Sequence, residues 1–199
     1  MIWIDGVLVS PGEGGVYGER IFQGYRVWDP RRSKFAALLH LGGEVELADS
    51  LRVLYLGAAN GTTVSHVADY VEVVYAVEIA PRPMQDLLAV ANRRPNVVPI
   101  LADATRPDTF APVMEAVDLI YQDVAHPDQA AIAARNAVFL REGGALVLML
   151  KTRSVDLRKT PAEVLDETVS AISGTYRVEQ TCWLEPYHRD HAAVIARLP

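Results

Sequence analysis

The sequence LRVLYLGAANGTT, residues 51–63, decides the expected fold. Its first half is a short apolar run, which is typical of a buried parallel strand with both faces covered. Gly57 and Gly61 follow, and glycine allows the positive φ and the close approach of a ligand that a tight turn requires. Thr62 or Thr63 can cap the helix that starts there. A strand, a glycine turn and a helix N-terminus in this order are typical of the first strand–turn–helix unit of a doubly wound α/β sheet, the unit that binds a nucleotide.

The glycine turn favours one class of nucleotide. It has no Gly-Lys-Ser/Thr, so it lacks the lysine with which a P-loop holds a triphosphate. It is also not a complete G-x-G-x-x-G, so it suits a dinucleotide pyrophosphate poorly. The G-x-x-x-G spacing suits S-adenosylmethionine (SAM), whose amino-acid carboxylate can lie near the helix N-terminus. An ordinary strand-to-helix turn is the alternative that this short motif leaves open.

The end of the next apolar run also favours a nucleotide. Residues 73–77 are apolar and lead to Glu78, which lies 21 residues after Gly57. An acidic residue at the end of the second strand can accept hydrogen bonds from both hydroxyls of a ribose. A solvated carboxylate at a strand end is the alternative, but the glycine turn at this spacing favours the ribose contact.

Composition bounds the class of protein. The chain has 199 residues, half of them hydrophobic, which fits one domain with a small extension. No run approaches the ~20 apolar residues of a membrane span, and the N-terminus lacks the pattern of a signal peptide. Cys182 is the one cysteine, so no internal disulfide can form and a cytoplasmic location is expected. The formal net charge of -6 argues against a protein that grips nucleic acid by bulk electrostatics.

Residues 1–33 differ from the rest of the chain. Strand-like runs at 1–4, 7–9 and 25–28 are separated by glycine and proline, which predicts a small N-terminal β extension. The main domain is then expected over residues 34–199. Four basic residues gather at the end of the extension: Arg26, Arg31, Arg32 and Lys34. On an acidic protein they form a candidate contact surface, with an ordinary solvated run as the alternative.

Apolar runs and helical patterns alternate regularly from residue 51, which predicts an α/β fold with a seven-stranded, mostly parallel sheet. Strands are expected at 53–56, 73–78, 97–101, 117–121, 145–150, 176–184 and 192–198. Helices are expected at 35–41, 62–69, 81–92, 127–140 and 161–173, with a broken helical stretch near 107–115. Gly143 and Gly144 look like a helix stop before the fifth strand. The connection before the last strand is short, so that strand is expected to be antiparallel.

Charged side chains follow the carboxyl ends of four predicted strands: Glu78, Asp103, Asp123 and Lys151. Ligands of such sheets bind at this edge. Asp103 can accept a hydrogen bond from an adenine amino group, cap a helix, or do both. Lys151 follows an apolar strand, and Asp123 nearby is expected to fix its direction. A lysine in this position can take the proton of a hydroxyl while a methyl group arrives. SAM already supplies an activated methyl group, so the protein need only align the reactants and assist loss of one proton.

Seven stretches of the chain carry a resemblance to a known family. They are VYGER at 16–20, YRVWDPRRSKFAA at 25–37, VLYLGAANGTTVSHVADYV at 53–71, VYAVE at 74–78, NVVPILADATRP at 96–107, DVAHPDQA at 123–130 and LEPYHRDHA at 184–192. They are spread along nearly the whole chain, from residue 16 to residue 192, and they resemble the fibrillarin family in its archaeal form. The resemblance implies a Rossmann-like SAM-dependent methyltransferase fold. It also implies SAM-dependent 2′-O-methylation of ribose in ribosomal and transfer RNA.

The resemblance further implies partners. The family works inside a box C/D guide ribonucleoprotein, with a guide RNA and a target rRNA or tRNA. Two proteins are expected beside it: a scaffold protein of the Nop56/58 type and a kink-turn-binding ribosomal-type protein. No membrane partner is expected. The glycine- and arginine-rich tail of the eukaryotic members is absent from this sequence, which favours the archaeal type.

The resemblance and the glycine turn together give a set of candidate site residues. SAM contacts are expected at Gly57, Ala58, Gly61, Thr62, Thr63, Glu78, Ile79, Asp103, Ala104, Asp123, Val124, Ala125 and His126. The catalytic group is expected to contain Lys34, Asp123 and Lys151, with Glu185 or His191 as its fourth member. RNA contacts are expected at Arg26, Arg31, Arg32, Lys34 and Arg153. Two departures concern the SAM site, since His126 stands where the family usually has glutamine and Asn60 replaces a usual serine.

Two other functions compete with this hypothesis. A SAM-dependent small-molecule O-methyltransferase would share the glycine turn and Glu78, but it usually needs a metal cluster or a substrate lid. The five histidines show no zinc spacing apart from the weak pair His188 and His191, so no metal site is expected. A non-catalytic subunit that only bridges guide particle and RNA is the third possibility. Asp123 and Lys151 argue against it.

Overall fold

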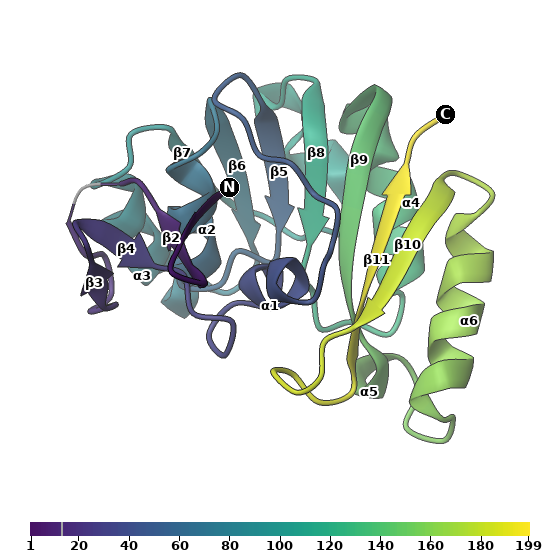
Figure 1. Ribbon diagram of the computed structural model, residues 1–199. Coiled ribbons are helices and arrows are strands. Elements are labelled where there is room, and N and C mark those ends of the chain that lie inside the picture. Colours follow the sequence, from purple (N-terminus) through teal and green to yellow (C-terminus); the bar gives the residue numbers. More distant parts are fainter. Residues whose placement is uncertain (13) are drawn as a thin grey trace.

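A seven-stranded mixed sheet forms the centre of the protein (Figure 1). The computed structural model describes residues 1–12 and 14–199. The strand order across the sheet is β10-β11-β9-β8-β5-β6-β7. The strands are β5 (Arg52–Leu56), β6 (Val73–Glu78), β7 (Val97–Leu101), β8 (Val117–Gln122), β9 (Leu140–Lys151), β10 (Arg177–Trp183) and β11 (His191–Arg197).

Strand directions place the site at one edge of this sheet. β5 is parallel to β6 and β8, β6 is parallel to β7, and β8 is parallel to β9. β11 is antiparallel to both of its neighbours, β9 and β10. The predicted seven-stranded sheet with an antiparallel last strand is therefore confirmed. The parallel strands all end at one edge, where the arrowheads of β5 and β8 point in Figure 1.

Helices cover both faces of the sheet. They are α1 (Lys34–His40), α2 (Thr62–Ala68), α3 (Pro81–Ala91), α4 (Gln129–Asn136), α5 (Thr152–Val155) and α6 (Pro161–Ile172), with short 3₁₀ turns at Pro107–Thr109, Ala111–Val113 and Ala137–Phe139. Side chains of β5 alternate between the two faces. Val53 joins a core with Phe35 of α1, whereas Leu54 joins a second core with Ile132 of α4. This alternation explains why the strand reads as continuously apolar.

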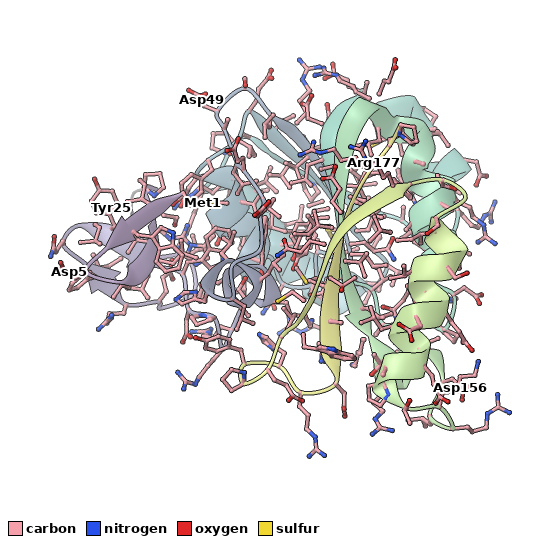
Figure 2. The ribbon with its side chains drawn as sticks, turned by 45° about the vertical axis from the view of Figure 1, so that its right-hand side comes forward. Met1, Asp5, Tyr25, Asp49, Asp156 and Arg177 are labelled. Carbon is pink, nitrogen blue, oxygen red and sulfur yellow. The ribbon has the colours of Figure 1, made fainter. Side chains whose placement is uncertain are left out.

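The N-terminal extension forms its own small antiparallel sheet. Its strands, in the order β1-β2-β4-β3, are β1 (Ile2–Ile4), β2 (Val7–Ser10), β3 (Ile21–Phe22) and β4 (Tyr25–Val27). The predicted β extension is thus confirmed, and β3 adds a strand that the sequence did not indicate. Leu8 and Trp28 are wholly buried and join the core beneath α1 and α2. Figure 2 shows Asp5 and Tyr25 at the outer end of this sheet. The division at residue 34 stays a prediction.

One local prediction was wrong, and one short helix was missed. Gly143 and Gly144 do not stop a helix, because they lie inside β9, and α4 already ends at Asn136. Gly143 has φ +72°. The register of β9 against β8 shifts here, and glycine tolerates the irregular backbone at such a shift. The short helix α5, directly after Lys151, was not predicted. No helix in residues 1–12 and 14–199 is long and apolar enough to cross a membrane.

Candidate active site

The glycine turn after β5 brings two strand ends together. Gly57 has φ +81°, and a Cβ at this position would collide with the carbonyl oxygen of Asp123. The backbone N–H groups of Gly57 and Ala58 both donate to the carbonyl oxygen of Val77, each at 3.0 Å. The turn is therefore held between the ends of β6 and β8. Gly61, with φ +82°, is the N-cap of α2, and a side chain there would press on α3.

Glu78 is oriented by the backbone around this turn. Its side chain is buried, and its two oxygens accept hydrogen bonds from Ala59 N–H at 2.8 Å and Ala80 N–H at 2.7 Å. A carboxylate offers about four lone-pair sites, so acceptor capacity remains for two hydroxyl groups. The neighbouring Ile79 exposes 63% of its surface, which is unusual for a large apolar residue at a strand end. This pair suits a ribose beside a flat apolar ring.

Asp103 and Ala104 line the same edge after β7. The N–H of Thr105 donates to the Asp103 carboxylate at 2.8 Å, and this hydrogen bond lowers the pKa of Asp103. Ala104 is buried, and its carbonyl oxygen accepts from Nδ2 of Asn136 at 2.9 Å. Asp103 therefore stays ionised and partly exposed, as an acceptor for an amino group must. Nδ1 of His126, in the loop after β8, accepts a hydrogen bond from the backbone N–H of Asp128 at 3.0 Å.

Lys34 and Asp123 form an ion pair at the centre of the edge. Nζ of Lys34 donates to both carboxylate oxygens at 2.7 Å, and the two side chains are about one-fifth exposed (21% and 22%). Ser33 is the N-cap of α1, and its Oγ accepts from Trp28 Nε1–H at 2.9 Å and from the Thr63 hydroxyl at 3.0 Å. Ser33 thus joins the start of α1 to the extension and to α2. Lys34, as the first helical residue, is fixed over the end of β8.

The cation beside Asp123 differs from the one that sequence reasoning placed there. We expected Asp123 to fix the direction of Lys151, but the carboxylate binds Lys34 instead. No ion pair within 4.0 Å joins Asp123 and Lys151 in the part of the chain that the structure describes. The reason is the position of α1, whose first residue reaches the end of β8 from across the sheet face. The side-chain nitrogen of Lys151 is therefore left for another partner.

His191 lies next to Lys151. The two residues are directly opposite each other in the β9–β11 ladder. Nδ1 of His191 lies 2.7 Å from the carbonyl oxygen of Arg189, and because a carbonyl only accepts, Nδ1 carries the proton. Burial lowers the pKa of His191, so the ring is neutral near pH 7 and Nε2 is free to accept. Glu185 is exposed in the loop between β10 and β11.

The predicted RNA contacts separate into two groups. Arg26 is wholly buried in ion pairs with Glu19 and Asp69, so its assignment as an RNA contact was wrong. A guanidinium without exposed surface cannot reach a phosphate. Arg31, Arg32 and Arg153 are exposed, and they stay predictions. The Arg32 guanidinium lies 4.5 Å from the centre of the Tyr17 ring, and Arg153 pairs with Asp190 at 3.2 Å.

A large cavity lies elsewhere. It has a volume of about 820 Å³ and opens at the amino ends of the parallel strands, among residues that include Glu44, Asp118 and Arg141. None of the predicted site residues lines it. Figure 2 shows the two ends of the sheet: Arg177, at the start of β10, lies opposite Asp156, which follows α5 near the strand ends. The candidate site is thus the carboxyl edge alone.

Sequence reasoning missed the residues that hold the site in place. Ser33 caps the helix that carries Lys34, Asn136 holds the Ala104 loop, and Gln129 binds the main chain of Lys151. All three are buried. Ser33 and Gln129 lie within the stretches that resemble fibrillarin, so a signal was present. Asn136 lies outside those stretches.

Relatives of known name share nearly the whole chain. A sequence model of the Fibrillarin family matches residues 8–199. A fibrillarin-like rRNA/tRNA 2′-O-methyltransferase from Methanoculleus marisnigri is 68% identical over 195 residues, covering 98% of each chain. A protein of the same name from Halobacterium salinarum is 50% identical over 193 residues, covering 96% of this chain and 91% of the relative.

Solved structures match the fold equally well. Fibrillarin in the crystal structure of a fibrillarin/Nop5p complex has a TM-score of 0.95 and 42% identity, covering 98% of this chain and 96% of that chain. Aeropyrum pernix fibrillarin, solved with natively bound S-adenosyl-L-methionine, has a TM-score of 0.83 and 43% identity, covering 92% and 84%. These neighbours confirm the Rossmann-like methyltransferase fold. Because the family model and these relatives cover nearly the whole length, the chain belongs to the fibrillarin family.

Proposed function

We propose that this protein transfers the methyl group of SAM to the 2′-hydroxyl of ribose in ribosomal and transfer RNA. The observation that carries the proposal is the arrangement at the carboxyl edge of the sheet. There, the Lys34–Asp123 ion pair and the Lys151–His191 pair lie beside the acidic residues that suit a nucleoside. The relatives named as rRNA/tRNA 2′-O-methyltransferases support the same activity. No feature of residues 1–12 and 14–199 specifically favours the small-molecule alternative.

The residues of this edge fit SAM. Glu78 offers oriented acceptors for the ribose hydroxyls, and Asp103 offers an ionised acceptor for the adenine amino group. Ile79 can cover the ring, and the Gly57 turn lets the end of β5 pack closely against the backbone of Asp123 at this edge. SAM would supply a methyl group on a sulfonium, which is a good leaving group that needs no further activation by the protein.

Three side chains then divide the remaining work. Two N–H groups of Lys34 bind Asp123, and its third can donate to an oxygen of the target ribose or phosphate. The hydroxyl oxygen would form a bond to the methyl carbon as the bond from that carbon to the sulfonium sulfur breaks, so that S-adenosylhomocysteine leaves and the hydroxyl loses its proton. Lys151 takes or shares this proton, and the free Nε2 of neutral His191 is placed to accept it from Lys151. We therefore assign His191, and not Glu185, as the fourth member of the catalytic group.

Placement of the RNA requires partners. The net charge of -6 repels a polyanion, and the exposed residues Arg31, Arg32 and Arg153 offer few phosphate contacts. We propose that a scaffold protein of the Nop56/58 type holds this protein against the target, as the fibrillarin/Nop5p complex of a relative suggests. A box C/D guide RNA and a kink-turn-binding ribosomal-type protein complete the proposed particle. A cytoplasmic location stays a prediction.

Reconstitution tests this proposal. Methylation of one guide-matched RNA is measured with the protein alone, and then with the scaffold, the kink-turn-binding protein and the guide RNA added. We expect efficient 2′-O-methylation only in the assembled particle at physiological salt. Equal activity of the protein alone would instead indicate a stand-alone RNA methyltransferase. No methylation of RNA in either case, with SAM bound, would refute the proposed substrate.

A further inference from the structure

The side chain of Gln129 holds the main chain of Lys151. Its Oε1 accepts from the Lys151 N–H at 3.0 Å, and its Nε2 donates to the Lys151 carbonyl oxygen at 3.1 Å. Gln129 is wholly buried at the start of α4. One amide therefore satisfies both polar groups of one residue, as a neighbouring strand would.

We call these two hydrogen bonds between the Gln129 amide and the Lys151 main chain the clamp. Its position explains why it is needed. β8 ends at Gln122, which pairs with Leu148 of β9, but β9 continues to Lys151. On its other side Lys151 still has a neighbour, His191 of β11. On the β8 side the ladder has already ended, so the N–H and C=O of Lys151 would lack partners there. The amide of Gln129 takes the place of the missing strand.

A second buried glutamine fixes the first. Nε2 of Gln122 donates to the carbonyl oxygen of Gln129 at 2.8 Å, and Gln122 is also wholly buried. Its Oε1 has no hydrogen-bond partner among the described residues. A buried acceptor without a partner costs free energy. The favourable contribution of the Gln122 amide is therefore its Nε2–H donor, which binds Gln129. Because Gln122 directly precedes Asp123, the two amides link the strand end of Asp123 to that of Lys151.

We propose that Gln129 is a positioning residue for Lys151, and that Gln122 holds Gln129 in turn. The inference rests on the proposed methyl transfer, in which Lys151 takes the proton of the ribose hydroxyl. Gln129 acts through Lys151, because its own amide groups bind the Lys151 backbone and point to no ligand. A reacting group displaced by ~1 Å can lose about 10² in rate, so the clamp has a measurable effect.

A double-mutant cycle tests the link to Lys151. Gln129→Met keeps the length of the side chain and removes both hydrogen bonds. In the assembled particle we expect its single-turnover rate to fall about 10- to 100-fold, with SAM affinity within about twofold of wild type. In a Lys151→Ala background the same substitution should change the residual rate by no more than about twofold. Equal losses in both backgrounds, or no loss in either, would overturn the inference.

Two further measurements separate positioning from general damage. Thr168→Val is the matched control, because it removes a buried hydrogen bond of 2.7 Å within α6 that involves no residue of the site, and it should leave the rate unchanged. Hydrogen exchange of the Lys151 amide should be at least about tenfold faster in Gln129→Met than in wild type. An unchanged exchange rate would also overturn the inference, whether or not the protein methylates RNA.

The outcomes for the two proposals are distinguishable. If wild type does not methylate RNA, the proposed function fails, and hydrogen exchange alone decides whether Gln129 holds Lys151. If wild type methylates RNA and Gln129→Met does so equally well, only the inference fails. Should Gln129→Met not fold, Gln122→Met takes its place, with a several-fold loss of rate and the same dependence on Lys151 expected.

Discussion

The buried guanidinium of Arg26 allows a sharp test of how the extension is attached. Arg26→Met keeps most of the apolar stem and removes the charge. The guanidinium forms ion pairs with Glu19 and, at 2.6 Å, with Asp69. It also donates to the carbonyl oxygen and the hydroxyl of Ser65, at 3.0 and 2.8 Å. The variant therefore leaves two almost fully buried carboxylates without the cation that they share.

The expected loss in the free energy of unfolding depends on the hydrogen-bond donors that the two carboxylates keep. Breaking a buried ion pair from one side typically costs about 3–5 kcal/mol. Asp69 keeps bonds from Arg94 at 2.6 Å and from Ser10 at 2.9 Å. Glu19 keeps backbone N–H donors of its own loop, at 3.0 and 2.9 Å. We therefore expect the lower end, a loss of about 3 kcal/mol in the free energy of unfolding. For a chain of this length the melting temperature should fall by about 6–12 °C.

Urea unfolding followed by circular dichroism measures this loss. Arg31→Met is the control, because Arg31 is an exposed arginine only five residues away. Its free energy of unfolding should stay within about 0.5 kcal/mol of wild type. Folded Arg26→Met should also keep the RNA affinity of wild type in the assembled particle. A loss of stability below about 1 kcal/mol, or a loss of RNA affinity in folded protein, would refute the structural role of Arg26.

Three further predictions concern the cofactor, the chemistry and pH. Glu78→Ala should weaken SAM binding by about 1–3 kcal/mol in titration calorimetry, because two hydroxyls lose their acceptor; unchanged affinity in folded protein would remove Glu78 from the site. Lys151→Ala should lower the methyl-transfer rate by about 10²–10⁴ and leave SAM affinity nearly intact; single-turnover rates near wild type would make Lys151 structural. Burial, helped by the charge of Arg26, lowers the pKa of His66 well below 6.5. The unfolded chain then binds a proton that the folded one does not, so stability should fall as pH drops below about 6.5. Urea midpoints of wild type and His66→Gln over that range check this, and parallel curves would contradict it.

The sequence predicted well those features that follow from local pattern. Apolar runs marked the five parallel strands, and the charged residue after four of these runs marked the edge at which they end. Glu78, Asp103, Asp123 and Lys151 therefore fell in the right place, because parallel strands share one carboxyl edge. The roles of the glycines at 57 and 61 were predicted equally well, since both have positive φ and a side chain at either position would collide with a neighbour.

Features that depend on distant contacts were not predictable in this way. Lys34 and Asp123 are 89 residues apart, and no spacing along the chain indicates that α1 reaches the end of β8. Arg26 looked like part of a basic surface because its neighbours in sequence are basic. A signal for its burial was present, however. In a strand, residues two apart share a face, and Arg26 is two residues before Trp28, the largest buried side chain of the protein.

The contacts of the extension show that it contributes to the site, although it carries no predicted catalytic residue before Lys34. Trp28 donates to the Ser33 hydroxyl, and Ser33 caps the helix whose first residue binds Asp123. Trp28 is held in turn by His66 of α2, whose ring stacks on the indole at 5.1 Å with an interplanar angle of 10°. His66 and Ser33 therefore connect α2, which begins at the glycine turn, to the same indole. Loss of residues 1–33 would remove the cap and the indole together, so the direction of Lys34 depends on a segment that adds no strand to the seven-stranded sheet.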